Sequence, residues 1–183
     1  AWDIREAEGI IRKNVMILLN QLPENEFDVV SQYAQPLPLL TISSILGIPA
    51  EDHNYLKDLG ISMTKALDLY MNLKDLTTIN DASKKFIAFF SEQVRQKTDN
   101  PGKDLVSKLI HKNRTEKAGL TDAELMSMCI FLFIAGEETL SGLISNGIYN
   151  LYRHADQLMY LRRNPASMET TMEEILRFEP VVQ

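Results

Sequence analysis

The sequence is poor in cysteine and in long apolar runs. A single cysteine, Cys129, excludes an internal disulfide and fits a reducing compartment such as the cytoplasm. The most apolar run, Cys129 to Gly136, is too short to cross a bilayer, and no basic leader followed by an apolar stretch opens the chain. We therefore expect a cytoplasmic protein that makes no membrane contact.

Positive charge is also scarce. The 183 residues carry a formal net charge of -6, and Lys and Arg form no stripe that could neutralise the phosphates of a nucleic acid. The three histidines lack the paired spacing of metal ligands, so no metal site is expected from this chain's own side chains. With 45% hydrophobic residues, residues 1–183 can bury a sizeable core as one helical domain.

Helical spacing of apolar residues recurs along nearly the whole chain, and no convincing strand-like alternation is present. The residues before Leu39, which include Pro36 and Pro38, are predicted to form a bend or a brief extended piece. The stretch 69–78 is predicted to be a polar connection. We expect helices over residues 3–22, 39–46, 51–63, 81–97, 104–111, 122–151, 155–162 and 166–178.

The predicted fold is therefore mainly α, with one long central helix over about 121–151 and little or no β-sheet. Thr121 and Glu124 form a capping-box pattern at the start of this helix. The sequence Ala135-Gly136-Glu137-Glu138-Thr139 then interrupts its apolar part, directly after the segment 126–134. An unpaired carboxylate is costly in such surroundings, so the two acids need an explanation.

Spacing suggests a chemical role for this interruption. Ala135 and Thr139 are four residues apart, so the threonine hydroxyl can bond the alanine carbonyl and loosen the helix. Small side chains at Ala135 and Gly136 let a flat ligand approach the backbone, and an acid beside a hydroxyl can relay protons. A purely structural role for Glu137 and Glu138 is equally well supported by the spacing alone.

A second motif lies on the last predicted helix. Glu174 and Arg177 are three residues apart, which predicts an ion pair on one helix face, and Glu179-Pro180 follows them. Taken alone, such a pair is common on surface helices. Cys129 lies on the apolar central helix and is interpreted as a buried core thiol rather than a ligand.

Together, the Ala-Gly-x-acid-Thr and Glu-x-x-Arg sequences resemble those of the haem-thiolate monooxygenases, the cytochrome P-450 superfamily. Further stretches look like soluble prokaryotic members, among them Ile45-Leu46-Gly47-Ile48-Pro49 and Leu120-Thr121-Asp122-Ala123-Glu124-Leu125. The resemblance covers nearly the whole chain. It implies the family's central helices, from the one called D to the one called K, and hence a truncated portion of a longer domain.

The resemblance implies a role for each site residue. Ala135, Gly136 and Thr139 would lie against the haem. Glu138 and Thr139 would steer protons to dioxygen as its O–O bond breaks, and Phe131 would point into the substrate pocket. The structural pair, Glu174 and Arg177, would belong to the buried network that holds the core on the proximal side of the haem.

The cysteine loop that ligates iron in this family has no counterpart in the sequence. The chain alone is therefore expected to be inactive and not to bind haem stably. The complete enzyme would take electrons from a ferredoxin-type or flavin redox partner and insert one oxygen atom into a small apolar organic substrate. An uncovered haem face predicts self-association of the truncated chain. The alternative is a stand-alone, non-catalytic helical fragment that acts as an interaction or binding module.

Overall fold

The computed structural model describes residues 4–67, 70–115 and 119–181. These residues form helices and no strand, so the prediction of a mainly α fold is confirmed. The α-helices are α1 (Ile4–Leu19), α2 (Pro36–Leu46), α3 (His53–Thr64), α4 (Leu73–Asp99), α5 (Leu105–Thr115), α6 (Asp122–Arg153), α7 (Ala155–Arg163) and α8 (Met168–Phe178). A π-helix, η1 (Val30–Ala34), and three short 3-10 turns, η2 (Ala50–Asp52), η3 (Lys65–Leu67) and η4 (Pro165–Ser167), connect them.

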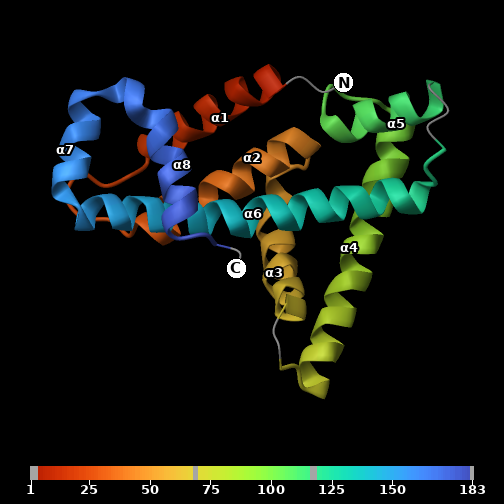
Figure 1. The fold of residues 1–183 in the computed structure, drawn as a ribbon. Helices are drawn as coiled ribbons and strands as arrows, with labels where there is room; N and C mark the ends of the chain where they lie inside the picture. The colour runs from red at the N-terminus through yellow and green to blue at the C-terminus, as the bar shows by residue number, and fades with distance from the viewer. Residues whose placement is uncertain (1–3, 68–69, 116–118, 182–183) are drawn as a thin grey trace.

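Helix α6 crosses the whole molecule and organises the other helices around it (Figure 1). Helices α1 and α2 lie on one side of α6, and α3 and α4 project together from the other side. Helices α7 and α8 pack at its C-terminal end. The predicted capping box is present at its start, where the Thr121 hydroxyl accepts a hydrogen bond from the Glu124 backbone N–H. The prediction of one long central helix is therefore confirmed.

The hydrophobic core lies where α6 meets α2, α3, α4 and α5. Three phenylalanines fill its centre: the ring centroids of Phe86 and Phe133 are 5.9 Å apart, and those of Phe86 and Phe90 are 6.2 Å apart. Cys129 is fully buried in the same cluster. The other buried members are Leu39, Leu46, Ile48, Leu56, Leu59, Ala82, Val94, Val106, Ile110 and Leu125.

The predicted irregular piece before Leu39 is present only over residues 20–28, and the chain is helical from there to Pro36 and beyond except at Gln35. Helix α2 already begins at Pro36, and the π-helix η1 precedes it, closed by a 2.9 Å hydrogen bond from the Gln35 N–H to the Val30 carbonyl. Proline is tolerated in the first helical turn because the backbone N–H that it lacks would have no partner there. The two prolines therefore mark a helix start rather than a break.

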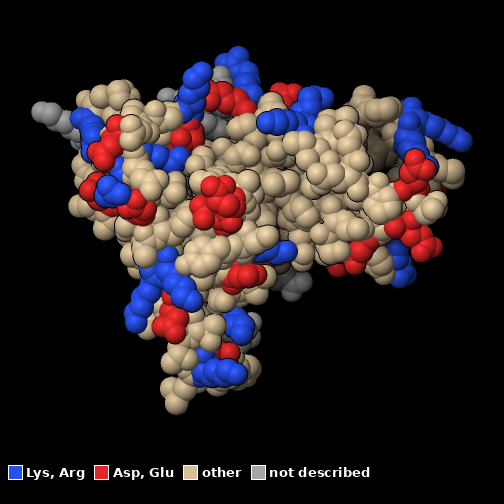
Figure 2. All heavy atoms as spheres, turned by 180° about the vertical axis from the view of Figure 1, so that it is seen from behind, with Lys and Arg blue, Asp and Glu red and all other residues tan. Residues whose placement is uncertain are grey.

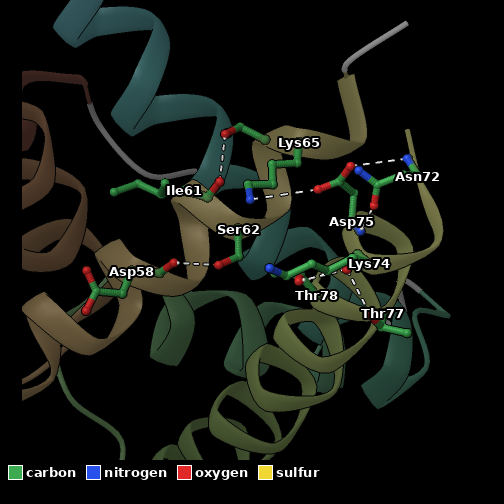
Figure 3. A network of polar contacts seen from close by, with 10 residues as sticks. Asp58, Ile61, Ser62, Lys65, Asn72, Lys74, Asp75, Thr77 and Thr78 are labelled. Atoms are coloured by element: carbon green, nitrogen blue, oxygen red, sulfur yellow. Dashed lines mark hydrogen bonds and ion pairs between the residues drawn. The ribbon is translucent and has the colours of Figure 1, made fainter. Parts of the chain in front are cut away.

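Helix α4 also starts earlier than its sequence suggests, at Leu73 rather than Asp81 (Figure 3). Asn72 caps it, because its side-chain oxygen accepts a 3.0 Å hydrogen bond from the Asp75 N–H, and the Asp75 carboxylate accepts a 3.1 Å bond from the Asn72 N–H. Lys65 Nζ lies 4.0 Å from Asp75 Oδ1 and ties this capping box to the end of α3. The prediction of a polar connection is therefore wrong for residues 73–78, while Leu69 lies outside the described residues.

The molecule exposes much apolar surface. Charged side chains gather along the upper edge, at both ends and on the lower projection in Figure 2, and the central face between them is mostly uncharged apart from a few acidic groups. Phe131 and Tyr152 keep 68% and 74% of their surface exposed. The total accessible area is 12383 Å², whereas a compact monomer of 20.8 kDa exposes about 8,900 Å².

Helix α6 is the one helix in the described ranges that is long and apolar enough to span a membrane, by length and composition alone. Core helices of soluble proteins have the same properties. Helix α6 contacts α2, α4 and α8, yet only 17% of its most apolar window is buried in the described structure.

Candidate functional site

The central feature of the site is the turn from Ala135 to Thr139 on α6. The Thr139 hydroxyl donates a 2.6 Å hydrogen bond to the Ala135 carbonyl, as the four-residue spacing predicts. Helix α6 is nevertheless α-helical from Asp122 to Arg153, so this bond does not open the backbone ladder. The hydroxyl is thus held against the backbone of its own helix.

Phe131, Ala135 and Thr139 lie on one face of α6 at successive four-residue intervals. Phe131 is largely exposed, whereas Ala135 and Thr139 are half-buried. Glu138 lies beside this face and is exposed to solvent. The structure therefore brings together an apolar side chain, a small side chain, a hydroxyl and an acid along an accessible stripe.

Gly136 faces α2 and not the stripe of Phe131, Ala135 and Thr139. A Cβ at this position would lie 3.5 Å from Cδ1 of Ile42, a residue of α2. This is an ordinary van der Waals distance, so packing against α2 does not by itself require glycine. The role of Gly136 as a cofactor contact stays a prediction.

Glu137 lies on the side of α6 turned away from the stripe and is half-buried. Burial raises the pKa of its carboxyl, the positive charge of Lys57 on α3 acts against that shift, and Glu138 adds to it. The two neighbouring acids therefore differ in environment, with the inner one partly desolvated and the outer one in solvent.

This arrangement predicts a pH effect for Glu137→Gln. The folded protein holds the Glu137 proton to a higher pH than the unfolded chain does, because the pKa of Glu137 is raised on folding. The free energy of unfolding of the wild type therefore falls as pH rises above about 4.5. The variant should lose this decline and exceed the wild type in stability at pH 7, measured by urea unfolding across pH. Glu138→Gln is the matched control and should keep most of the decline, because burial is the largest cause of the raised pKa of Glu137 and Glu138 contributes least. An unchanged pH profile in Glu137→Gln would contradict the assignment.

Glu174 and Arg177 form the predicted pair on α8. Two hydrogen bonds, of 2.8 Å from Nε and 2.6 Å from Nη2, join the Arg177 guanidinium to the Glu174 carboxylate. The pair lowers the pKa of Glu174 through these bonds. Both side chains are mostly exposed, at 58% for Glu174 and 69% for Arg177. In the part of the chain that the structure describes, the pair is exposed, and its place in a buried network of the complete protein stays a prediction.

Two contacts of α6 with the end of the chain were not anticipated from the sequence. A Cβ on Gly142 would lie 2.8 Å from Cγ1 of Val181, so the residues after α8 cover α6 one turn beyond Thr139. A Cβ on Gly147 would lie 3.2 Å from Cδ1 of Ile175, which marks the close crossing of α6 and α8. Gly142 and Gly147, two of the three glycines of α6, are the only sequence signal for these contacts, and they do not identify their partners.

Cys129 is a core thiol, as predicted. Burial raises its pKa to about 11, Asp104 adds to the shift and Lys97 opposes it. The thiol is therefore protonated at neutral pH and lies inside the core, away from the stripe of Phe131 and Thr139.

The histidines do not gather into a site. A nitrogen of His53 lies 3.3 Å from the Ile48 carbonyl, and one of His154 lies 2.9 Å from the Asn150 carbonyl. His111 is exposed on α5. Among the described residues no three His, Cys, Asp or Glu side chains lie together as metal ligands would.

Comparison with known proteins gives the stripe a context. The cytochrome P-450 family model matches residues 61–166, which is more than half of the chain. The biotin biosynthesis cytochrome P-450 of Bacillus subtilis (strain 168) is 38% identical over 174 residues, covering 94% of this chain and 44% of the relative. A second cytochrome P-450 of the same organism is 37% identical over 182 residues, covering 98% of this chain and 43% of that relative.

Solved structures agree. The crystal structure of P450BioI in complex with acyl carrier protein ligated to hexadec-9Z-enoic acid matches with a TM-score of 0.89 and 36% identity, over 98% of this chain and 47% of that one. The crystal structure of CalO2 matches with a TM-score of 0.88 and 27% identity, over 98% of this chain and 45% of that one. The chain thus spans less than half the length of these relatives. The family model and the fold lead to one conclusion: this chain belongs to the cytochrome P-450 family.

Proposed function

We propose that this chain is the central portion of a haem-thiolate monooxygenase that inserts one atom of dioxygen into an apolar organic substrate. The observation that carries the proposal is the stripe on α6, where the Thr139 hydroxyl lies against the Ala135 carbonyl and Glu138 stands beside it in solvent. Membership of the cytochrome P-450 family supports this interpretation. The two acids of the turn then have different tasks, with Glu138 in the relay and Glu137 outside it.

The stripe fits haem as one wall of its site. Phe131 is apolar and open, Ala135 is small, and no charged side chain stands on the line from Phe131 to Thr139. The residues of this chain would not supply the thiolate that binds the haem iron, since the single cysteine is buried in the core. When bound, haem supplies the iron at which dioxygen is reduced and its O–O bond is broken. Stable haem binding is accordingly proposed for the complete protein and not for this chain alone.

The residues of this chain move protons and exclude water. Glu138 is exposed, so its carboxylate can take up a proton from solvent. Thr139 can release its hydrogen bond to Ala135 by rotating about χ1, and its hydroxyl can then donate toward the open face. Phe131 presents an apolar side chain to the same face, which favours an apolar substrate over water there.

The wider setting follows from this proposal. The complete enzyme would receive two electrons from a ferredoxin-type or flavin redox partner in the cytoplasm. Its substrate would be apolar. The similar P450BioI structure holds a fatty acid on an acyl carrier protein, and an acyl chain is one substrate of this kind. Self-association of the present chain stays a prediction, which the large accessible area supports.

Glu138→Gln in the complete enzyme tests the relay. The amide cannot deliver a proton, so turnover should fall by about 100-fold and the solvent hydrogen isotope effect on turnover should rise. Glu137→Gln is the matched control on the neighbouring residue and should leave both quantities near wild type. Equal losses in the two variants would contradict the assignment of Glu138, because they would indicate a general effect of charge on α6.

A further inference from the structure

We draw no further inference here: the strongest candidate, the open apolar groove of about 1280 Å³ that residues 25–32 form with the second half of α6 at Tyr149 and Tyr152, carries nothing because no contact in the described part of the chain shows what covers it.

Discussion

Gly47→Ala is expected to destabilise the protein by about 2–5 kcal/mol, one of the two largest effects of a single substitution that we predict. Gly47 ends α2 in the left-handed region, with φ of 67°, which costs an L side chain energy. A Cβ there would also lie 2.6 Å from both Asp104 Cγ and Lys97 Nζ. Neither side chain can move freely, because Lys97 and Asp104 form an ion pair with each other.

Urea unfolding of the wild type and the variant measures this loss. Gly9→Ala is the matched control, since Gly9 lies on the exposed side of α1 and a Cβ there would meet no atom within 4 Å. Alanine is the better helix former, so this variant should gain up to about 1 kcal/mol. A loss of equal size in both variants would show that the position of Gly47 is not special.

Lys97→Met is expected to cost about 3–5 kcal/mol, because it leaves a buried carboxylate without its cation. Lys97 Nζ lies 3.1 Å from Asp104 Oδ2 and donates a 2.9 Å hydrogen bond to the Gly47 carbonyl. The two side chains are only 12% and 11% exposed. Asp104 keeps its hydrogen bonds from the backbone N–H and the hydroxyl of Ser107, but these do not neutralise its charge.

A double-mutant cycle separates this pair from general packing. Asp104→Asn removes the carboxylate charge while keeping its shape, so Lys97→Met should cost less in that background than in the wild type. Circular dichroism during urea unfolding provides the four stabilities. Strictly additive losses would contradict the proposed coupling. The pair matters for the site because it joins α2, α4 and α5, which pack around α6.

Local signals made much of the fold predictable. The Thr121 and Glu124 capping box fixed the start of α6 to within a residue, and the apolar residues that follow fixed its helical period. The start of α4 was missed because Asn72 and Asp75 also belong to a polar stretch that is typical of connections. The intrinsic propensities of Asn72 and Asp75 favour a turn, whereas the capping box that they form together favours a helix start. The structure has the helix.

The candidate site, like the fold, could be predicted where its contacts are local and not where they join distant segments. Contacts within one helix, such as Thr139 with Ala135 and Arg177 with Glu174, follow from spacing and were predicted. Contacts between distant segments, such as Val181 over Gly142, depend on how helices cross and have no local signature. The exposure of the pair on α8 is likewise a matter of what packs against it, which spacing does not specify.

The measurement that tests the central claim most directly is the coupling of electron consumption to product in the complete enzyme carrying Thr139→Ala. Ser145→Ala is the matched control, because Ser145 makes the same kind of hydroxyl bond on α6, 2.8 Å to the Ser141 carbonyl, away from the stripe. If Thr139 passes protons to dioxygen, Thr139→Ala should still consume electrons but release most of the reduced oxygen as hydrogen peroxide, while Ser145→Ala stays coupled. Unchanged coupling in Thr139→Ala would contradict the relay.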